Sequence, residues 1–202
     1  MSSILSFVDH NKLRFTNYLL LPFSAVFFIL SRLRVWFYKV GFLKTSQAEV
    51  PVIVVGNITV GGSGKTPIVI ALCRYFESQG KSIGVVSRGF GGEYVQDILK
   101  VNQFTDAREC GDEPALIAQQ TNAQVVVAKR RNKAIKYLTT NHKVDIIISD
   151  DGLQHYAMGR DVEIVVIDGI RRFGNGLLLP SGPLREPVKR LKSVDIIINN
   201  GS

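Results

Sequence analysis

Short apolar runs alternate with amphipathic stretches from residue 50 onward. The apolar runs are continuous, as in strands that are covered on both faces. Helices are expected between these runs, at 66–79 with Gly80 as its stop, at 111–120 and within 130–140. The pattern predicts an α/β fold with a mostly parallel sheet flanked by helices. The expected strands are 50–57, 82–87, 123–128, 144–151, 162–169 and 194–200.

The N-terminal segment has a different pattern, because residues 15–31, "FTNYLLLPFSAVFFILS", carry no charge. A full membrane span needs about 20 apolar residues, so this segment is short, and Pro22 is expected to kink it. Arg32 and Arg34 follow directly and no small-residue cleavage site is present, which argues against a secretory signal. We expect residues 1–48 to form a membrane-associated helical region, with a buried core helix as the alternative.

Net charge and cysteine content indicate which binding partners and which cellular compartment to expect. The net charge of +8 favours anionic partners, which are nucleic acid, acidic lipid or a phosphorylated substrate. No nucleic-acid-binding module is recognisable, so nucleic acid is not expected. Cys73 and Cys110 show neither metal-site spacing nor a disulfide pattern, which favours a reducing compartment. The last expected strand ends near Asn200 with no crossover helix after it, so we expect a truncated sequence.

The stretch "GNITVGGSGKTP" at 56–67 follows a predicted buried strand and opens a predicted helix, the context that supports a phosphate-binding loop. Lys65 is expected to reach the β- and γ-phosphates of a nucleotide, and the Thr66 hydroxyl to ligate Mg²⁺. The usual pattern has glycine where this chain has Thr59. A glycine-rich turn without a ligand is the alternative. The predicted nucleotide-binding residues are Thr59, Val60, Gly61, Gly62, Ser63, Gly64, Lys65 and Thr66.

A second motif, "IIISDDGLQH", places Asp150 and Asp151 at the end of a predicted buried strand. In phosphate-loop proteins a carboxylate at this place holds magnesium opposite the Ser/Thr of the loop. Adjacent carboxylates repel one another unless a cation or hydrogen bonds hold them, which favours a metal site. One of the two could instead cap the turn before Gly152. His155 could be structural or catalytic.

Two further groups of residues are candidates. Asp112 and Glu113 in "CGDEP" begin a predicted helix, where Asp112 serves either as the N-cap or as a base for a substrate hydroxyl. Several arginines follow predicted strands, at the rim where ligands bind in open α/β sheets. They are predicted to contact an anionic substrate, with solvated surface charge as the alternative. These arginines are Arg88, Arg171, Arg172 and Arg185.

Taken in order, the motifs resemble one family. "VGNITVGGSGKTP", "GVVSRGFGG", "GDEPALIA", "SDDGLQH" and "VEIVVIDGIRRFGNGLLLPSGPLRE" are similar to the tetraacyldisaccharide 4'-kinases of lipid A biosynthesis in Gram-negative bacteria. The resemblance implies a P-loop kinase core at 49–202 that acts at the cytoplasmic face of the inner membrane. It implies transfer of the γ-phosphate of ATP to the 4'-hydroxyl of a tetraacylated glucosamine disaccharide 1-phosphate, forming lipid IVA.

The resemblance also implies roles for single residues. Asp112 would be the catalytic base, with Lys65 at the phosphates and Glu113 and His155 on the substrate side. Asp150, Asp151 and Thr66 would hold Mg²⁺. Family members continue into a C-terminal portion that includes a histidine thought to pair with the base.

Two alternatives belong to other classes of protein. "VGGSGKT" also resembles the deviant Walker loop of membrane-bound partitioning ATPases, which act as dimeric switches. Those proteins carry a lysine before the glycine pair, where this chain has Val60, and this argues against a switch. The third possibility is an inactive nucleotide-binding fragment.

Overall fold

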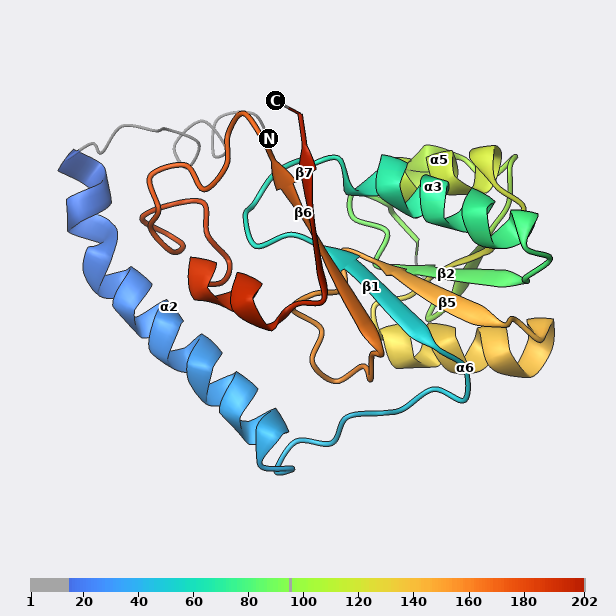
Figure 1. Ribbon diagram of the computed structural model, residues 1–202, viewed down its shortest axis with the longest axis horizontal. Coiled ribbons are helices and arrows are strands. Elements are labelled where there is room, and N and C mark those ends of the chain that lie inside the picture. Colours follow the sequence, from blue (N-terminus) through green and yellow to red (C-terminus); the bar gives the residue numbers. More distant parts are fainter. Residues whose placement is uncertain (1–14, 95, 202) are drawn as a thin grey trace. The chain divides into compact units, whose positions relative to one another are not determined.

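The computed structural model describes residues 15–94 and 96–201 and has an α/β fold (Figure 1). The chain forms two compact units. The larger unit comprises residues 45–56 and 65–164, and the smaller comprises 15–44, 57–64 and 165–201. Residues 1–14, part of the predicted membrane-associated region, lie outside the described residues.

The larger unit is built on five strands in the order β3-β4-β2-β5-β1. β1 pairs with β5, β5 with β2 and β2 with β4, all in parallel, whereas β3 is antiparallel to β4. This arrangement agrees with the predicted mostly parallel sheet. The strands are β1 (Val52–Gly56), β2 (Ile83–Ser87), β3 (Leu99–Val101), β4 (Gln124–Val127) and β5 (Ile146–Asp150).

Helices cover both faces of this sheet. α3 (Lys65–Ser78) and α5 (Asp112–Gln120) lie on one face, and α6 (Arg131–His142) lies on the other (Figure 1). A short helix, α4 (Ala107–Cys110), precedes α5. Every residue of β1 and β2 is buried, because both faces of the sheet are covered, and this explains the continuous apolar pattern of these strands.

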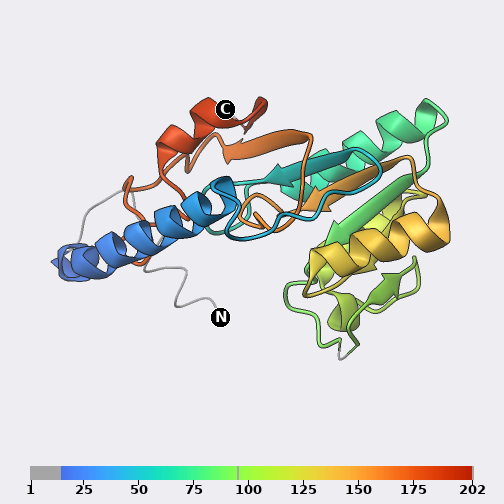
Figure 2. The same ribbon diagram turned by 90° about the horizontal axis from the view of Figure 1, so that it is seen from below.

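The smaller unit contains α2 (Phe15–Lys39), a 3₁₀ helix η1 (Val188–Ser193) and β7 (Ile196–Asn200). β6 (Val162–Asp168) begins in the larger unit, continues into the smaller one and neighbours β7 in the sheet order. α2 is one helix through Pro22 and extends well beyond the uncharged segment (Figure 2). It is long and apolar enough to cross a membrane, and only two of its residues are buried.

Helices of soluble proteins usually bury their apolar side chains and expose their polar ones, whereas α2 does the reverse. Its two buried residues are polar, Asn17 and Ser24. Asn17 Nδ2 donates to the Ser181 carbonyl at 2.7 Å, and Ser24 Oγ donates to the Leu178 carbonyl at 2.9 Å. Most of its large apolar side chains are exposed, Leu19 by 69% for example. The polar side of α2 therefore packs on its own protein unit and its apolar side faces outward.

The structure differs from the predicted elements in several places, one of which is η1, which was not predicted. β3 and α4 were not predicted, because a three-residue strand and a four-residue helix are too short to show a period. β7 was expected to be covered on both faces, but four of its five residues are exposed. Asp112 was expected as a possible N-cap of α5, but the cap residue is Gly111 and Asp112 is already helical.

Candidate active site

The loop between β1 and α3 depends on glycine at two positions with positive φ, Gly61 at 96° and Gly64 at 79°. Side chains of the smaller unit hold two of its carbonyl groups. Asn200 Nδ2 donates to the Ser63 carbonyl at 3.1 Å, and an Arg171 Nη2 donates to the Gly62 carbonyl. A side chain at Gly64 would collide with the Asn200 amide. The loop shape is therefore fixed by contacts as well as by glycine.

Lys65 is the first residue of α3 and is buried to all but 6% of its side chain. Its Nζ lies 3.7 Å from Asp151 Oδ1. The strand register explains the proximity, because Val55 of β1 pairs with Asp150 of β5, so both strands end at one edge of the sheet. The predicted phosphate-loop lysine and the second aspartate of the "DDGLQH" motif therefore lie together.

Asp150 is the most unusual carboxylate of the site. It has no exposed surface, and neither of its oxygen atoms has a hydrogen-bond partner within the described part of the chain. Burial and, to a smaller extent, the Glu113 carboxylate raise the pKa of Asp150 to about 7 against the opposing effect of Lys65. A buried, unpaired carboxylate of this kind is a suitable ligand for a cation.

Arg131 fixes the turn that follows Asp150. Its Nη2 donates to the carbonyl oxygens of both Asp150 and Asp151 at 2.9 Å, and burial lowers the pKa of its guanidinium. Asp151 has a φ of 47°, a conformation that non-glycine residues adopt at a cost. Sequence reasoning did not identify Arg131, because a cation at a helix start gives no sign of which carbonyls it meets.

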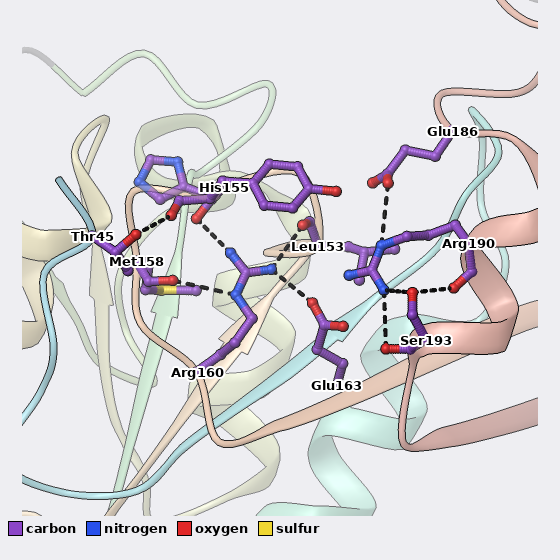
Figure 3. A network of polar contacts seen from close by, with 10 residues as sticks. Thr45, Leu153, His155, Met158, Arg160, Glu163, Glu186, Arg190 and Ser193 are labelled. Carbon is purple, nitrogen blue, oxygen red and sulfur yellow. Dashed lines mark hydrogen bonds and ion pairs between the residues drawn. The ribbon is translucent and has the colours of Figure 1, made fainter. Parts of the chain in front are cut away.

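The residues after Asp151 fold back onto Arg160, which donates hydrogen bonds to three carbonyl groups of this segment (Figure 3). His155 lies in this segment. Its backbone amide donates to the Gly152 carbonyl at 2.9 Å, and its carbonyl accepts from Arg160. The sequence singled out His155 but gave no sign of Arg160.

Asp112 is exposed at the start of α5, and Glu113 beside it is half-buried. Gly111 occupies the cap position without a side-chain bond, so the Asp112 carboxylate is not committed to capping. A carboxylate in the first helical turn is stabilised by the helix dipole. Glu113 lies close enough to Asp150 to influence its pKa, which brings the "CGDEP" and "DDGLQH" motifs to the same edge of the larger unit.

The four predicted arginines differ in their surroundings. Arg88 and Arg172 are exposed. Arg171 is engaged, because its Nε donates to Asp168 Oδ2 at 2.8 Å in addition to its bond with Gly62. Arg185 is half-buried, and its backbone amide donates to the Ile58 carbonyl at 2.8 Å. A small pocket of the smaller unit is lined by Thr59, Val60, Asp168, Arg171, Arg172, Gly174 and Pro183.

No group of three or more His, Cys, Asp or Glu side chains with metal-binding geometry occurs among the described residues. Magnesium does not require one, since it usually keeps several waters and binds one or two carboxylates together with substrate phosphates. The donors Thr66, Asp150 and Asp151 match that preference. The arrangement as a whole suits an anionic ligand that carries a divalent cation.

Comparison with known proteins gives consistent results. A family model for LpxK, tetraacyldisaccharide-1-P 4'-kinase, matches residues 16–202. The chain is 61% identical over 184 residues to the tetraacyldisaccharide 4'-kinase of Ruthia magnifica subsp. Calyptogena magnifica, covering 91% of the chain and 58% of that protein. It is 53% identical over 185 residues to the Aeromonas salmonicida enzyme of the same name, covering 92% of the chain and 56% of that protein.

A solved structure is also similar. It is the crystal structure of the "apo" form of LpxK from Aquifex aeolicus in complex with ATP, with a TM-score of 0.81 and 33% sequence identity. The match covers 92% of the chain and 59% of the Aquifex protein. The chain thus spans less than two thirds of the length of each of these relatives.

Proposed function

Because the chain belongs to the tetraacyldisaccharide-1-P 4'-kinase family, we propose that it takes part in the phosphorylation of a lipid A precursor. The reaction is transfer of the γ-phosphate of ATP to the 4'-hydroxyl of a tetraacylated glucosamine disaccharide 1-phosphate. Membership of this family confirms the resemblance inferred from the motifs. The activity itself is our proposal, since the chain spans only 58% of the Ruthia magnifica relative.

The observation that carries the proposal is the Lys65–Asp151 contact at the common end of β1 and β5. A lysine at the start of α3 is placed to neutralise charge on the β- and γ-phosphates. Helix N-termini also favour phosphate through their dipole and their unpaired amide groups. The Aquifex aeolicus structure, described with ATP, supports ATP as the nucleotide.

We infer that the site uses Mg²⁺. The two unpartnered oxygen atoms of the fully buried Asp150 carboxylate fit a cation, and Asp151 and Thr66 would complete the protein's share of its ligands. The cation would neutralise charge that develops on the phosphoryl oxygens. Arg131 fixes the backbone that carries both aspartates.

We assign Asp112 as the base that accepts the proton of the 4'-hydroxyl. It is exposed, lies in the first turn of α5 and is not used as a cap. Glu113, half-buried beside it and near Asp150, supports the site through its charge. Phosphoryl transfer passes through a loose transition state, so most of the catalysis comes from positioning and charge neutralisation, and the base adds to it.

Arg88, Arg172 and Arg185 are proposed to bind the acceptor, whose 1-phosphate suits guanidinium groups. His155 is also proposed to contact the acceptor substrate. Arg171 is better suited to the nucleotide side, because it holds the Gly62 carbonyl of the phosphate loop.

We propose that α2 attaches the protein to the cytoplasmic face of the inner membrane. Its exposed apolar side suits lipid, and Arg32, Arg34 and Lys39 at its C-terminal end suit anionic headgroups. Asn17 and Ser24 bind the backbone of residues 178–181, and irregular backbone exposed to lipid does not occur within the hydrocarbon layer. This favours a helix that lies in the membrane interface over one that spans the bilayer.

The test is transfer of ³²P from labelled ATP to a tetraacyldisaccharide 1-phosphate in mixed micelles, with the Ruthia magnifica kinase as the positive control. Product that depends on both substrates supports the kinase. ATP hydrolysis at a rate that does not depend on the lipid would indicate the ATPase switch. Nucleotide binding without transfer, while the control is active, would indicate an inactive nucleotide-binding fragment.

A further inference from the structure

The Arg160 guanidinium gathers the backbone of the segment that follows Asp151 (Figure 3). Its Nη1 donates to the Leu153 carbonyl at 2.8 Å and its Nη2 to the His155 carbonyl at 2.6 Å. Its Nε donates to the Met158 carbonyl at 3.2 Å. A single side chain thus binds three carbonyl groups spread over six residues, from 153 to 158.

Arg160 is itself held in place. Its Nη1 lies 3.0 Å from Glu163 Oε1, and the two side chains are only 13% and 11% exposed. Its Cζ lies 5.3 Å from the centre of the Tyr156 ring. A charge this far from solvent requires a partner, and hydrogen bonds from a charged donor are about twice as strong as neutral ones. The guanidinium shape matters as much as the charge, because three donors point in fixed directions.

The opposite side of the same segment pairs with residues 45–47. The Ser46 amide donates to the Ala157 carbonyl at 2.9 Å, and the Gly159 amide donates to the Ser46 carbonyl at 2.8 Å. Thr45 Oγ1 adds a bond to the Tyr156 carbonyl at 3.2 Å. These bonds hold residues 156–159. The Leu153 carbonyl accepts from Arg160, and the His155 carbonyl accepts from Arg160 and from the Met158 amide, the latter at 3.0 Å.

We propose that Arg160 is a positioning residue for phosphate transfer, since it fixes the loop on which Asp151 and His155 are carried. Arg131 holds the carbonyl of Asp151 at one end of this loop, and Arg160 holds the part from Leu153 onward. With both ends fixed, Asp151 keeps its φ of 47° and its contact with Lys65. The inference rests on the proposed function, because it assigns a catalytic purpose to a contact outside the reacting groups.

A matched control exists in the smaller unit. Arg190 forms an ion pair with Glu186, with 3.3 Å from Nε to Oε2, and the two side chains are 13% and 10% exposed (Figure 3). Its Nη1 also donates to the Ser193 hydroxyl at 2.8 Å. Arg190 thus resembles Arg160 in burial and in having a Glu partner, but it lies within η1, and its side chain binds Glu186, two residues before that helix, and Ser193 at its end.

The experiment compares Arg160→Lys with Arg190→Lys by hydrogen–deuterium exchange of the ligand-free protein and by phosphate-transfer kinetics. We expect Arg160→Lys to accelerate amide exchange in residues 152–159 at least tenfold and Arg190→Lys to leave that segment unchanged. Outer-shell partners of metal sites typically matter 10- to 100-fold. We therefore expect Arg160→Lys to lower kcat or raise the half-saturating Mg²⁺ concentration by about that factor, with the acceptor KM nearly unchanged.

Unchanged exchange in residues 152–159 overturns the proposal. So does faster exchange with kinetics equal to those of Arg190→Lys, because loop order would then be irrelevant to transfer. If Arg160→Lys does not fold, Glu163→Gln replaces it and is expected to show the same effects to a smaller degree. A wild-type protein that transfers no phosphate refutes the proposed function instead, and the exchange comparison still decides whether Arg160 orders the loop.

Discussion

The Ser24 hydroxyl lies 2.8 Å from the Ser181 hydroxyl, and the Ser181 amide donates to the same Ser24 oxygen at 3.0 Å. Ser181 is fully buried. Two serines more than 150 residues apart thus satisfy one another at the contact between α2 and the loop before η1. One side of α2 therefore binds protein, and the other, exposed side is the one that we propose contacts lipid.

Substitutions on the two sides of α2 are expected to affect different properties, stability on one side and lipid binding on the other. Ser24→Ala removes the acceptor of a buried amide and should lower the free energy of unfolding in detergent by about 1–3 kcal/mol. Leu19→Ala should leave unfolding nearly unchanged, but it should weaken binding to anionic lipid vesicles roughly 50-fold, because each of the three carbon groups that it removes contributes about 0.8 kcal/mol when buried in lipid. Melting curves and vesicle sedimentation measure the two quantities. Equal lipid binding by Leu19→Ala and wild type would refute the lipid-facing role of that side.

Lys65→Ala is expected to lower ATP turnover by about 10²-fold or more, because it removes a charge aimed at the phosphates. The change should affect the melting temperature little, since Asp151 is 31% exposed and can bind water in place of the lysine. Steady-state kinetics and a melting curve test this prediction. A fall in melting temperature that matches the loss of turnover would show that Lys65 acts through the fold.

Asp112→Asn is expected to lower kcat by about 10²–10⁴-fold, the range for a general base, with the ATP KM and the melting temperature nearly unchanged. The nearby Asp106 is a true cap, because its side chain accepts from the Arg108 amide at 2.8 Å. Asp106→Ala should therefore show the reverse, a loss of about 1 kcal/mol in stability with a normal kcat. A normal rate in Asp112→Asn would remove Asp112 from the reaction.

Arg171 and Arg172 are adjacent but are expected to affect different substrates. Arg171→Ala frees the Gly62 carbonyl and should mainly raise the ATP KM. Arg172 is exposed, so Arg172→Ala should mainly raise the acceptor KM. The two KM values of both variants test the assignment, and identical profiles would contradict it. The Asp168 partner of Arg171 gives a further control, because Asp168→Asn should shift the ATP KM in the same direction as Arg171→Ala.

Both cysteines are expected to resist alkylation in the folded protein. Cys73 and Cys110 have no exposed surface, and burial raises the pKa of Cys73 to about 12. Because only the thiolate reacts, about one Cys73 in 10⁴ would be reactive at pH 8 even if reagent reached it. The reaction should accelerate as pH rises toward 12 and become rapid in denaturant. Mass spectrometry after iodoacetamide treatment measures it, and rapid labelling of native Cys73 at pH 8 would contradict the prediction.

The strands of the larger unit could be predicted from the sequence because each is a continuous apolar run covered on both faces. β3 was missed because it lacks such a run. It is a short antiparallel strand in which only Val101 is buried. The "GGSGKT" and "SDDGLQH" motifs were also recognisable, because phosphate and metal chemistry require those residue types at strand ends. The Lys65–Asp151 contact then places the two motifs side by side.

Arg131 and Arg160 could not be predicted, because their partners are backbone carbonyls whose direction is set by the folded loop. The sequence shows where an arginine is, but it does not show which carbonyl groups surround that arginine in the folded chain. Likewise, Asp112 looked like a cap because of its residue type, whereas the chain places Gly111 at the cap position with a φ of 91°. Residue roles that depend on loop conformation require the structure.

The contacts of α2 also have a consequence for folding during synthesis, because its partners are made much later than the helix itself. Asn17 binds a carbonyl that lies 164 residues further along the chain. At 5–20 residues per second, a ribosome needs roughly 8–33 seconds to make that distance. For that time the helix has an uncovered polar side and an apolar exterior, and its own docking loop does not yet exist. If α2 attaches to the membrane as proposed, a nascent α2 meets lipid before it meets Ser181, and the remaining chain folds onto a helix that is already at the membrane.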